Sequence, residues 1–385
     1  MRLTLALAER DPDSIDSFFG PAAWRDEARR QRLTIRQIQE AAQALLHRVA
    51  ADKGPRADFL ARQLRALAAR AELLAGVRRP FAEESRLLFG VGPPPIDRTR
   101  VAAARASLDR LVPGRGDLTR RLGAVQSRFV VPPDRVPAVF SRAIEECRAI
   151  TARHVTLPAD ERVAISEVRE LQWIAFTRYE GGHRSRITIN TSAAFTVDDL
   201  LQLACHESYP GHHVINVLVD DSLVRAAHRP ELTVQLLFSP QALLAEGAAS
   251  IAPQLAFSDA ERVEVERRVL CPLAGVDPKG IELSVALSRL VEELNSVRSD
   301  IAVRYVDGGL EFARAAAALE QDALIGSPDV MLRFLNEYRT YSVAYARGPD
   351  LAAAYITAHA SDGDLAARWR TYVQLAARPD QAFAK

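Results

Sequence analysis

The sequence has few cysteines, no long apolar run and almost no net charge, and each absence narrows the class of protein. Only three cysteines occur in the 385 residues, namely Cys147, Cys205 and Cys271. Their wide spacing matches neither a disulfide framework nor a paired-cysteine metal site. We therefore expect a protein of a reducing compartment, without a disulfide framework.

Charge and hydropathy exclude two further classes of partner. The chain carries 50 basic and 49 acidic residues, which argues against nucleic acid and anionic membrane surfaces as partners. No stretch approaches the length of a membrane span. The apolar run from Met1 to Ala8 is too short for a secretory signal. These features predict a cytoplasmic protein with no membrane association.

Two regions of the chain differ in residue pattern. In residues 1–157, apolar residues recur three and four positions apart, which is typical of helices. After Pro158, short β-branched or aromatic runs cover residues 163–168, 173–177 and 186–190, and Glu180-Gly181-Gly182 supplies a turn between the last two. We predict a mainly α fold with a small antiparallel β-sheet. An N-terminal helical region, 1–157, would pack with a catalytic region, 158–385, as one compact unit.

One helix should begin directly after these strands. Thr196 is suited to the N-cap position, and Asp199 supplies the acid three residues later. The apolar residues that follow would carry this helix toward His206. The helix therefore leads into the most unusual segment of the chain.

Three of the eight histidines lie in the segment from His206 to His213. In one common zinc site, two histidines one helical turn apart bind the metal, and the glutamate after the first activates water. Here the residue four after His206 is Pro210, which cannot bind a metal. His206 and Glu207 therefore fit the pattern, and the second histidine must be His212 or His213.

The Pro210-Gly211 pair can resolve this spacing. Proline lacks an N–H and disturbs a helix, while glycine adopts backbone angles that other residues avoid. Looping out both residues would place His212 where the second zinc histidine belongs and would leave His213 for substrate or supporting contacts. We favour His212 as the metal ligand and keep His213 as the alternative.

Glu246 is the candidate for the third ligand. It lies within an apolar helical pattern, where a buried acid requires a partner or a metal. Gly247 next to it would allow close approach of a neighbouring helix. Three protein ligands would leave one position of a single Zn²⁺ ion open for water.

At these residues the chain resembles a bacterial family called domain of unknown function 885. The family pattern His-Glu-x-x-Pro-Gly-His-His is matched at residues 206–213, and Glu246-Gly247 matches its Glu-Gly element. Residues 16–21 and 341–348 resemble two further family elements, although Ala248 stands where an aromatic residue is common. The resemblance implies a zincin-like metallopeptidase fold.

These residues together predict a zinc-dependent metallopeptidase that acts on peptides or small amides. Glu207 would be the general base. Tyr345, which the resemblance places near the site, would stabilise the oxyanion, with Tyr341 and His213 as rivals. The strand at residues 186–190 could pair, as a sheet edge, with an extended peptide.

Two other functions use the same residue types. Histidines and carboxylates on helices also hold non-haem iron in oxygenases, and Glu292, Glu293 and Asp300 are spare acids for a di-iron site. These acids lack the paired Glu-x-x-His arrangement of such sites. The second alternative is a catalytically inactive helical binding protein that keeps the motif.

Overall fold

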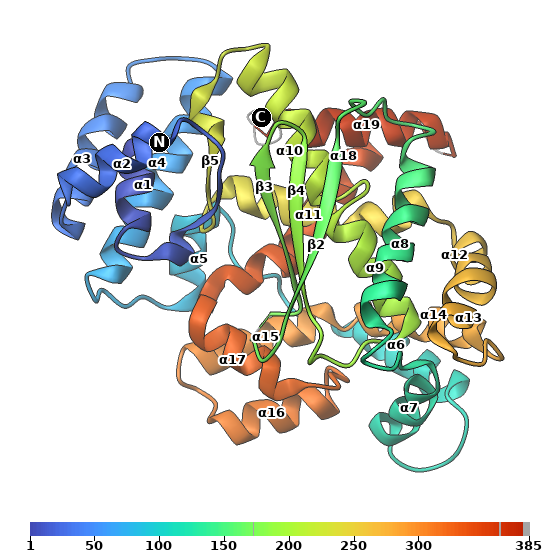
Figure 1. The fold of residues 1–385 in the computed structure, drawn as a ribbon. Coiled ribbons are helices and arrows are strands. Elements are labelled where there is room, and N and C mark those ends of the chain that lie inside the picture. Colours follow the sequence, from blue (N-terminus) through green and yellow to red (C-terminus); the bar gives the residue numbers. More distant parts are fainter. Residues whose placement is uncertain (172, 362, 380–385) are drawn as a thin grey trace.

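The computed structural model describes residues 1–171, 173–361 and 363–379, and most of them are helical (Figure 1). The α-helices are α1 (Arg2–Ala8), α2 (Ala22–Gln31), α3 (Ile35–Val49), α4 (Pro55–Leu74), α5 (Phe81–Phe89), α6 (Arg98–Leu111), α7 (Leu118–Gln126), α8 (Val136–Thr151), α9 (Val197–Glu207), α10 (His212–Val219), α11 (Pro240–Ala256), α12 (Asp259–Val265), α13 (Cys271–Ala274), α14 (Ile281–Glu292), α15 (Asn295–Val306), α16 (Phe312–Gln321), α17 (Pro328–Tyr338), α18 (Ser342–His359) and α19 (Leu365–Ala377). The strands are β1 (Ile15–Phe18), β2 (Arg162–Val168), β3 (Ala175–Gly181), β4 (Arg184–Asn190) and β5 (Val234–Leu236). Short 3₁₀ helices cover Pro12–Ser14, Ser127–Phe129, Pro230–Thr233 and Arg339–Tyr341, and π-helices cover Asp220–Arg225 and Glu266–Leu270. The prediction of a mainly α fold is confirmed.

The larger sheet is mixed, so the prediction of an antiparallel sheet is wrong in part. Its strand order is β2-β4-β3, in which β3 and β4 form an antiparallel hairpin while β2 pairs with β4 in parallel. β4 is therefore the central strand and has no free edge for a peptide, contrary to the expectation for residues 186–190. The two edge strands are β2 and β3. A second sheet, β1-β5, joins the N-terminal region to the middle of the chain.

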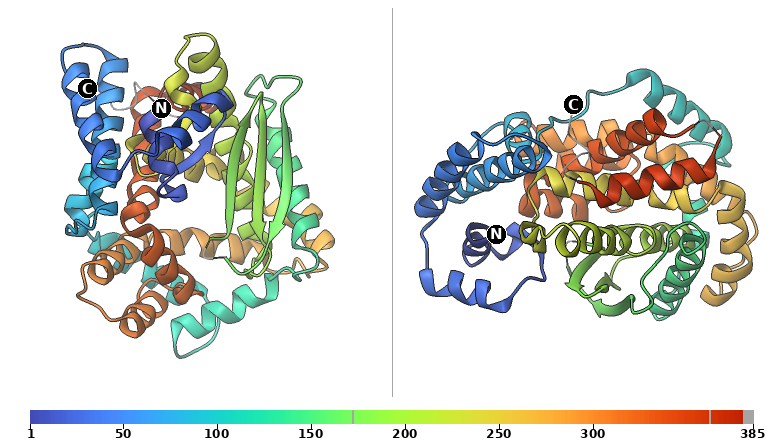
Figure 2. Two further views of the ribbon diagram at one scale, coloured as in Figure 1. Left: turned by 60° about the vertical axis from the view of Figure 1, so that its left-hand side comes forward. Right: turned by 90° about the horizontal axis from the view of Figure 1, so that it is seen from above.

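The helices behind the sheet are stacked in layers. α9 and α10 contact the sheet, α11 packs on α9 and α10, and α18 packs on α11. The view from above in Figure 2 shows this order, with the sheet on one side and the C-terminal helices on the other. The predicted start of α9 is confirmed, because Thr196 accepts a hydrogen bond from the Asp199 N–H in a capping box. The stacking fixes the position of α9 between the sheet and α11.

A disulfide bond links Cys147 of α8 to Cys205 of α9. The wide cysteine spacing predicted no disulfide framework, and this prediction is wrong for this pair. The two cysteines are 58 residues apart in sequence, but α8 and α9 pack side by side with both side chains fully buried. Cys271 is free and buried. The bridge ties α8 to the helix that ends in the histidine-rich segment.

Candidate metal centre

The segment between the two helices makes a tight loop. α9 ends at Glu207 and α10 begins at His212, and the Gly211 N–H donates a hydrogen bond to the Cys205 carbonyl at 3.0 Å. A Cβ atom on Gly211 would lie 1.8 Å from the carbonyl oxygen of His206. Only glycine fits here, so the loop folds back and presents His206 and His212 side by side, with ring centroids 4.8 Å apart.

Glu246 of α11 completes a group of three possible metal ligands. Its Oε2 atom lies 3.4 Å from His206 Nε2 and 3.6 Å from His212 Nε2. One ligand atom from each of the three residues lies within 4.8 Å of the others. Ligands about 2.1 Å from a tetrahedral zinc ion would be about 3.4 Å apart, which matches the two measured separations.

The chemistry of the group also fits a metal ion. Glu246 Oε2 is buried and has no hydrogen-bond partner in the described part of the chain, whereas Oε1 accepts from the Tyr341 hydroxyl at 2.7 Å. Burial opposes the charged form of His212, but the Glu246 carboxylate outweighs it and raises the pKa of His212 to about 9. Conversely, His212 and His206 overcome burial and lower the pKa of Glu246. A bound cation would take the place of the proton that gives His212 its charge.

A close helix contact brings Glu246 and Tyr341 to the same place. Gly247 of α11 faces Gly348 of α18, and a Cβ atom on Gly247 would lie 2.3 Å from the Gly348 carbonyl oxygen. The two glycines let the backbones touch. α18 follows Tyr341 directly, so the tyrosine hydroxyl reaches the ligand carboxylate and can orient it.

Glu207 is held beside these residues by the sheet. Its side chain is 5% exposed, and its Oε2 atom accepts a hydrogen bond from the Thr177 hydroxyl of β3 at 2.6 Å. The same hydroxyl also lies 2.9 Å from the Glu207 carbonyl oxygen. Thr177 thereby fixes the carboxylate in one orientation without a salt bridge.

These side chains open into a cavity of about 340 Å³. Its walls include β1 and the outer strand β3, and His206, Glu207, His212 and Glu246 all line it. Tyr345, which is 40% exposed, lines the cavity too, and its ring centroid lies 5.7 Å from that of Tyr341. The structure thus brings five predicted site residues and the rival Tyr341 into one space.

Two charged residues on opposite strands line the same cavity. Asp16 lies on β1 and Arg178 on β3. Burial, with smaller contributions from Glu246 and Glu207, raises the pKa of Asp16 to about 7. Neither Thr177 nor Asp16 was predicted as a site residue. Thr177 has no local motif, and Asp16 lies in the noted segment 16–21, but nothing in that segment indicates that β1 lies beside the metal ligands.

His213 does not line the cavity. It is fully buried, with Nδ1 2.8 Å from the Ser185 hydroxyl and Nε2 3.0 Å from Glu161 Oε2. The same Glu161 oxygen accepts from the Tyr209 hydroxyl at 2.5 Å. Arg148 donates to the other Glu161 oxygen at 2.7 Å, and together these contacts lower the pKa of Glu161 to about 2 against the effect of burial. Glu161 therefore anchors residues on both sides of the Pro210-Gly211 loop, and His213 supports the site from behind.

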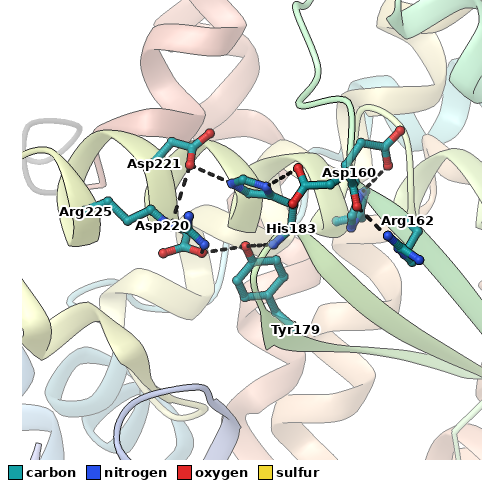
Figure 3. Close-up of polar contacts among 9 residues, drawn as sticks. Asp160, Arg162, Tyr179, His183, Asp220, Asp221 and Arg225 are labelled. Atoms are coloured by element: carbon teal, nitrogen blue, oxygen red, sulfur yellow. Dashed lines mark hydrogen bonds and ion pairs between the residues drawn. The ribbon is translucent and has the colours of Figure 1, made fainter.

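A second polar cluster fastens the β3–β4 hairpin to the π-helix Asp220–Arg225 that continues α10. The His183 side chain lies between Asp160 and Asp221, with Nδ1 and Nε2 at 2.8 and 2.7 Å from their carboxylates (Figure 3). Next to it, the Tyr179 hydroxyl donates to Asp220 at 2.8 Å. Thr177 lies on β3, and His212 lies on α10, which the π-helix continues. The cluster therefore joins the two segments that carry these site residues.

Comparisons with known proteins reveal a fold but no family. No family model matches the chain, and no curated protein matches it. A solved structure described as "the putative lipoprotein from Colwellia psychrerythraea" is similar at 16% identity and a TM-score of 0.57, over 91% of this chain and 67% of the other. Another, "a putative lipoprotein of unknown function from Shewanella oneidensis", has 15% identity and a TM-score of 0.44, over 91% and 75%. At this identity the Colwellia protein shows a shared fold alone.

These findings overturn the resemblance drawn from the motifs. Assignment to the domain of unknown function 885 family is wrong, because no family model matches and the similar Colwellia structure, described as a putative lipoprotein, supports neither that family nor a zincin-like peptidase. In the described part of the chain, no helix is long and apolar enough to cross a lipid bilayer. The cytoplasmic location stays a prediction.

Proposed function

We propose that the chain is a zinc-dependent hydrolase that cleaves peptides or small amides. The convergence of His206, His212 and Glu246 on one point, beside the Glu207 carboxylate, supports this most directly. These three residues would hold the ion and leave a coordination position free. When bound, zinc supplies Lewis acidity that polarises a carbonyl group and makes water a better nucleophile.

The chain's own residues account for the proton transfers and the orientation. Glu207, held by Thr177, would take the proton from the attacking water and return it to the leaving amine. Tyr341 is engaged with Glu246 and would hold that ligand in place. Tyr345 lines the cavity and would donate its hydroxyl hydrogen to the developing oxyanion.

The arrangement of the acids favours one metal ion over a di-iron site. Glu293 is paired with Arg100, and Asp300 lies 3.7 Å from Arg304. Neither lines the metal cavity, and neither does Glu292. Among the residues that the structure describes, the metal-ligand group comprises His206, His212 and Glu246 alone.

The first experiment is metal analysis of protein purified without a histidine tag, followed by a screen of a peptide library. One zinc ion per chain supports the hydrolase. Two iron ions would support the oxygenase, and no metal affinity would support the inactive binding protein. His206→Ala should lose the metal, since it removes one of three ligands.

The second experiment is Glu207→Gln, which removes the base but leaves the ligands. We expect normal zinc content and a loss of turnover of about 10²-fold or more for any peptide found to be cleaved. Glu167→Gln, which changes an exposed acid on β2, serves as the control and should keep full activity. Unchanged turnover of Glu207→Gln would refute the role of this residue.

A further inference from the structure

A second cleft, separate from the metal site, has a volume of about 910 Å³. It lies between α6, α11, α14, α15, α18 and α19, and Tyr345 lines both this cleft and the metal cavity. We call it the arginine cleft, because its lining includes Arg100, Arg289, Arg298, Arg347 and Arg368. Its volume is in the range of small-molecule sites.

The acids around the cleft do not neutralise all of these arginines. Arg100 is paired with Glu293, and Arg289 with Asp259. In contrast, no acid of the described residues lies within ion-pair distance of Arg298 or Arg347. Glu292 also lines the cleft and acts on Arg298 electrostatically without forming an ion pair with it. The lining holds five arginines against four acids, Asp97, Glu292, Glu293 and Asp350, and therefore keeps a small excess of positive charge.

Three residues that line the cleft each have one buried polar atom without a hydrogen-bond partner in the described part of the chain. These atoms are Nε of Arg298, Nε of Arg347 and the hydroxyl of Ser296. Arg298 is fixed in place by a hydrogen bond from its NH2 group to the Val291 carbonyl at 2.8 Å. A buried donor without an acceptor costs free energy, and a ligand that supplies the acceptor removes this cost.

We propose that the arginine cleft binds an anionic oxygen group, either a phosphate or a carboxylate, between Arg298, Arg347 and Ser296. A guanidinium group offers a planar fork of donors that matches both kinds of anion. The serine hydroxyl adds a neutral donor. The site stands on residues that the proposed hydrolase mechanism does not use, so it does not depend on that proposal.

Titration calorimetry of the full chain, freed of metal by a chelator, tests the site with inorganic phosphate at low ionic strength. A second arm uses a short peptide with a free carboxyl terminus and the same peptide with an amidated terminus. We expect a Kd of about 1 mM or tighter for at least one of the two anions. Phosphate alone would identify a phosphate ligand, whereas a peptide that loses binding on amidation would identify a terminal carboxylate.

Matched arginine variants locate the binding site. Arg347→Gln should weaken binding about tenfold or more, because it removes a charge-assisted donor. Arg178→Gln removes an arginine that lines the metal cavity, and it should leave the affinity unchanged. Arg298→Lys keeps the charge but loses the planar fork, and it should also weaken binding. Thermal melting of each variant checks that it is folded.

Two results would overturn the proposal. One is the absence of binding for both anions at concentrations up to about 10 mM. The other is an affinity lost in Arg178→Gln but kept in Arg347→Gln, which would place the anion in the metal cavity.

Discussion

Gly211 occupies a position in which no side chain fits. Its Cα packs against the backbone of the last turn of α9, and a Cβ atom would overlap the carbonyl oxygens of His206 and Cys205. The glycine is required by this close approach of the backbone. The position of His212 therefore depends on the absence of one methyl group.

Gly211→Ala should separate the two histidines. We expect a loss of about 3 kcal/mol in the free energy of unfolding, since the overlap is with backbone that cannot move aside. Metal binding, followed by calorimetry, should weaken in parallel. Gly123→Ala in α7 is the control, because a Cβ atom there meets nothing within 4 Å and the change should be neutral or slightly stabilising. Normal zinc affinity in Gly211→Ala would show that the loop can rearrange.

His183 should make stability depend on pH. Burial opposes its charge, but Asp221 and Asp160 outweigh this effect and raise the pKa of His183 above its ordinary value. A protonated imidazole donates to both aspartates, whereas a neutral one has a single N–H to donate. The stabilisation is therefore complete below a pH of about 6.5 and is lost as the pH rises through the raised pKa.

His183→Gln tests this dependence. The melting temperatures of the two proteins should differ most near pH 6 and converge as the pH rises. The neighbouring groups Asp220, Tyr179 and Arg225 are kept in both proteins, so their titration cancels in the difference. A difference that is the same at every pH would assign His183 a packing role only.

The sequence could name the metal-site residues but not their supports. His206, Glu207 and His212 share one short segment, and Glu246 is conspicuous as an acid in an apolar helix. Thr177, Glu161 and Asp16 have no such signal, because their roles depend on which strand lies beside which helix. His213 illustrates the same limit, since the residue pattern left it open as a metal ligand, a substrate contact or a supporting residue, and the structure shows that it does not line the cavity.

At the scale of elements, the pair α11 and α18 determines where the third ligand lies. Gly247→Ala should push the helices apart, at a cost of about 1–3 kcal/mol in the free energy of unfolding. Glu246 and Tyr341 belong to different sides of this contact, so we also expect zinc affinity to fall about tenfold. Ser250→Ala on the same helix is the control. A stability loss without a change in zinc affinity would contradict the link between the contact and the ligand.

The order of the strands shows why element positions were easier to predict than their pairing. The runs of β-branched residues located three strands and a Gly-Gly turn correctly within a few residues. The hairpin followed from the turn. The parallel pairing of β2 with β4 did not, because nothing local distinguishes the two edges of a hairpin. This missing information also hid the fact that β3, and not β4, lines the cavity.

For the whole molecule, the bridge between Cys147 and Cys205 is the strongest single constraint on the unfolded chain. In the chain-entropy description, a bridge with a sequence separation of 58 residues stabilises the folded state by about 4 kcal/mol, because it restricts the unfolded chain. The double variant Cys147→Ser/Cys205→Ser should lower the free energy of unfolding by about this amount. Denaturant titration measures it, and Cys271→Ser provides a control for loss of a buried thiol. Equal stability of the double variant and its parent would show that the bridge contributes nothing.

The tight loop at Gly211 affects how such a metal site can be recognised in a sequence. His206 and His212 are six positions apart, although their side chains meet as closely as those of histidines one helical turn apart. A pattern search that demands the shorter interval passes over this chain entirely. A description of such a metal site must therefore allow the longer interval when a Pro-Gly pair comes directly before the second histidine.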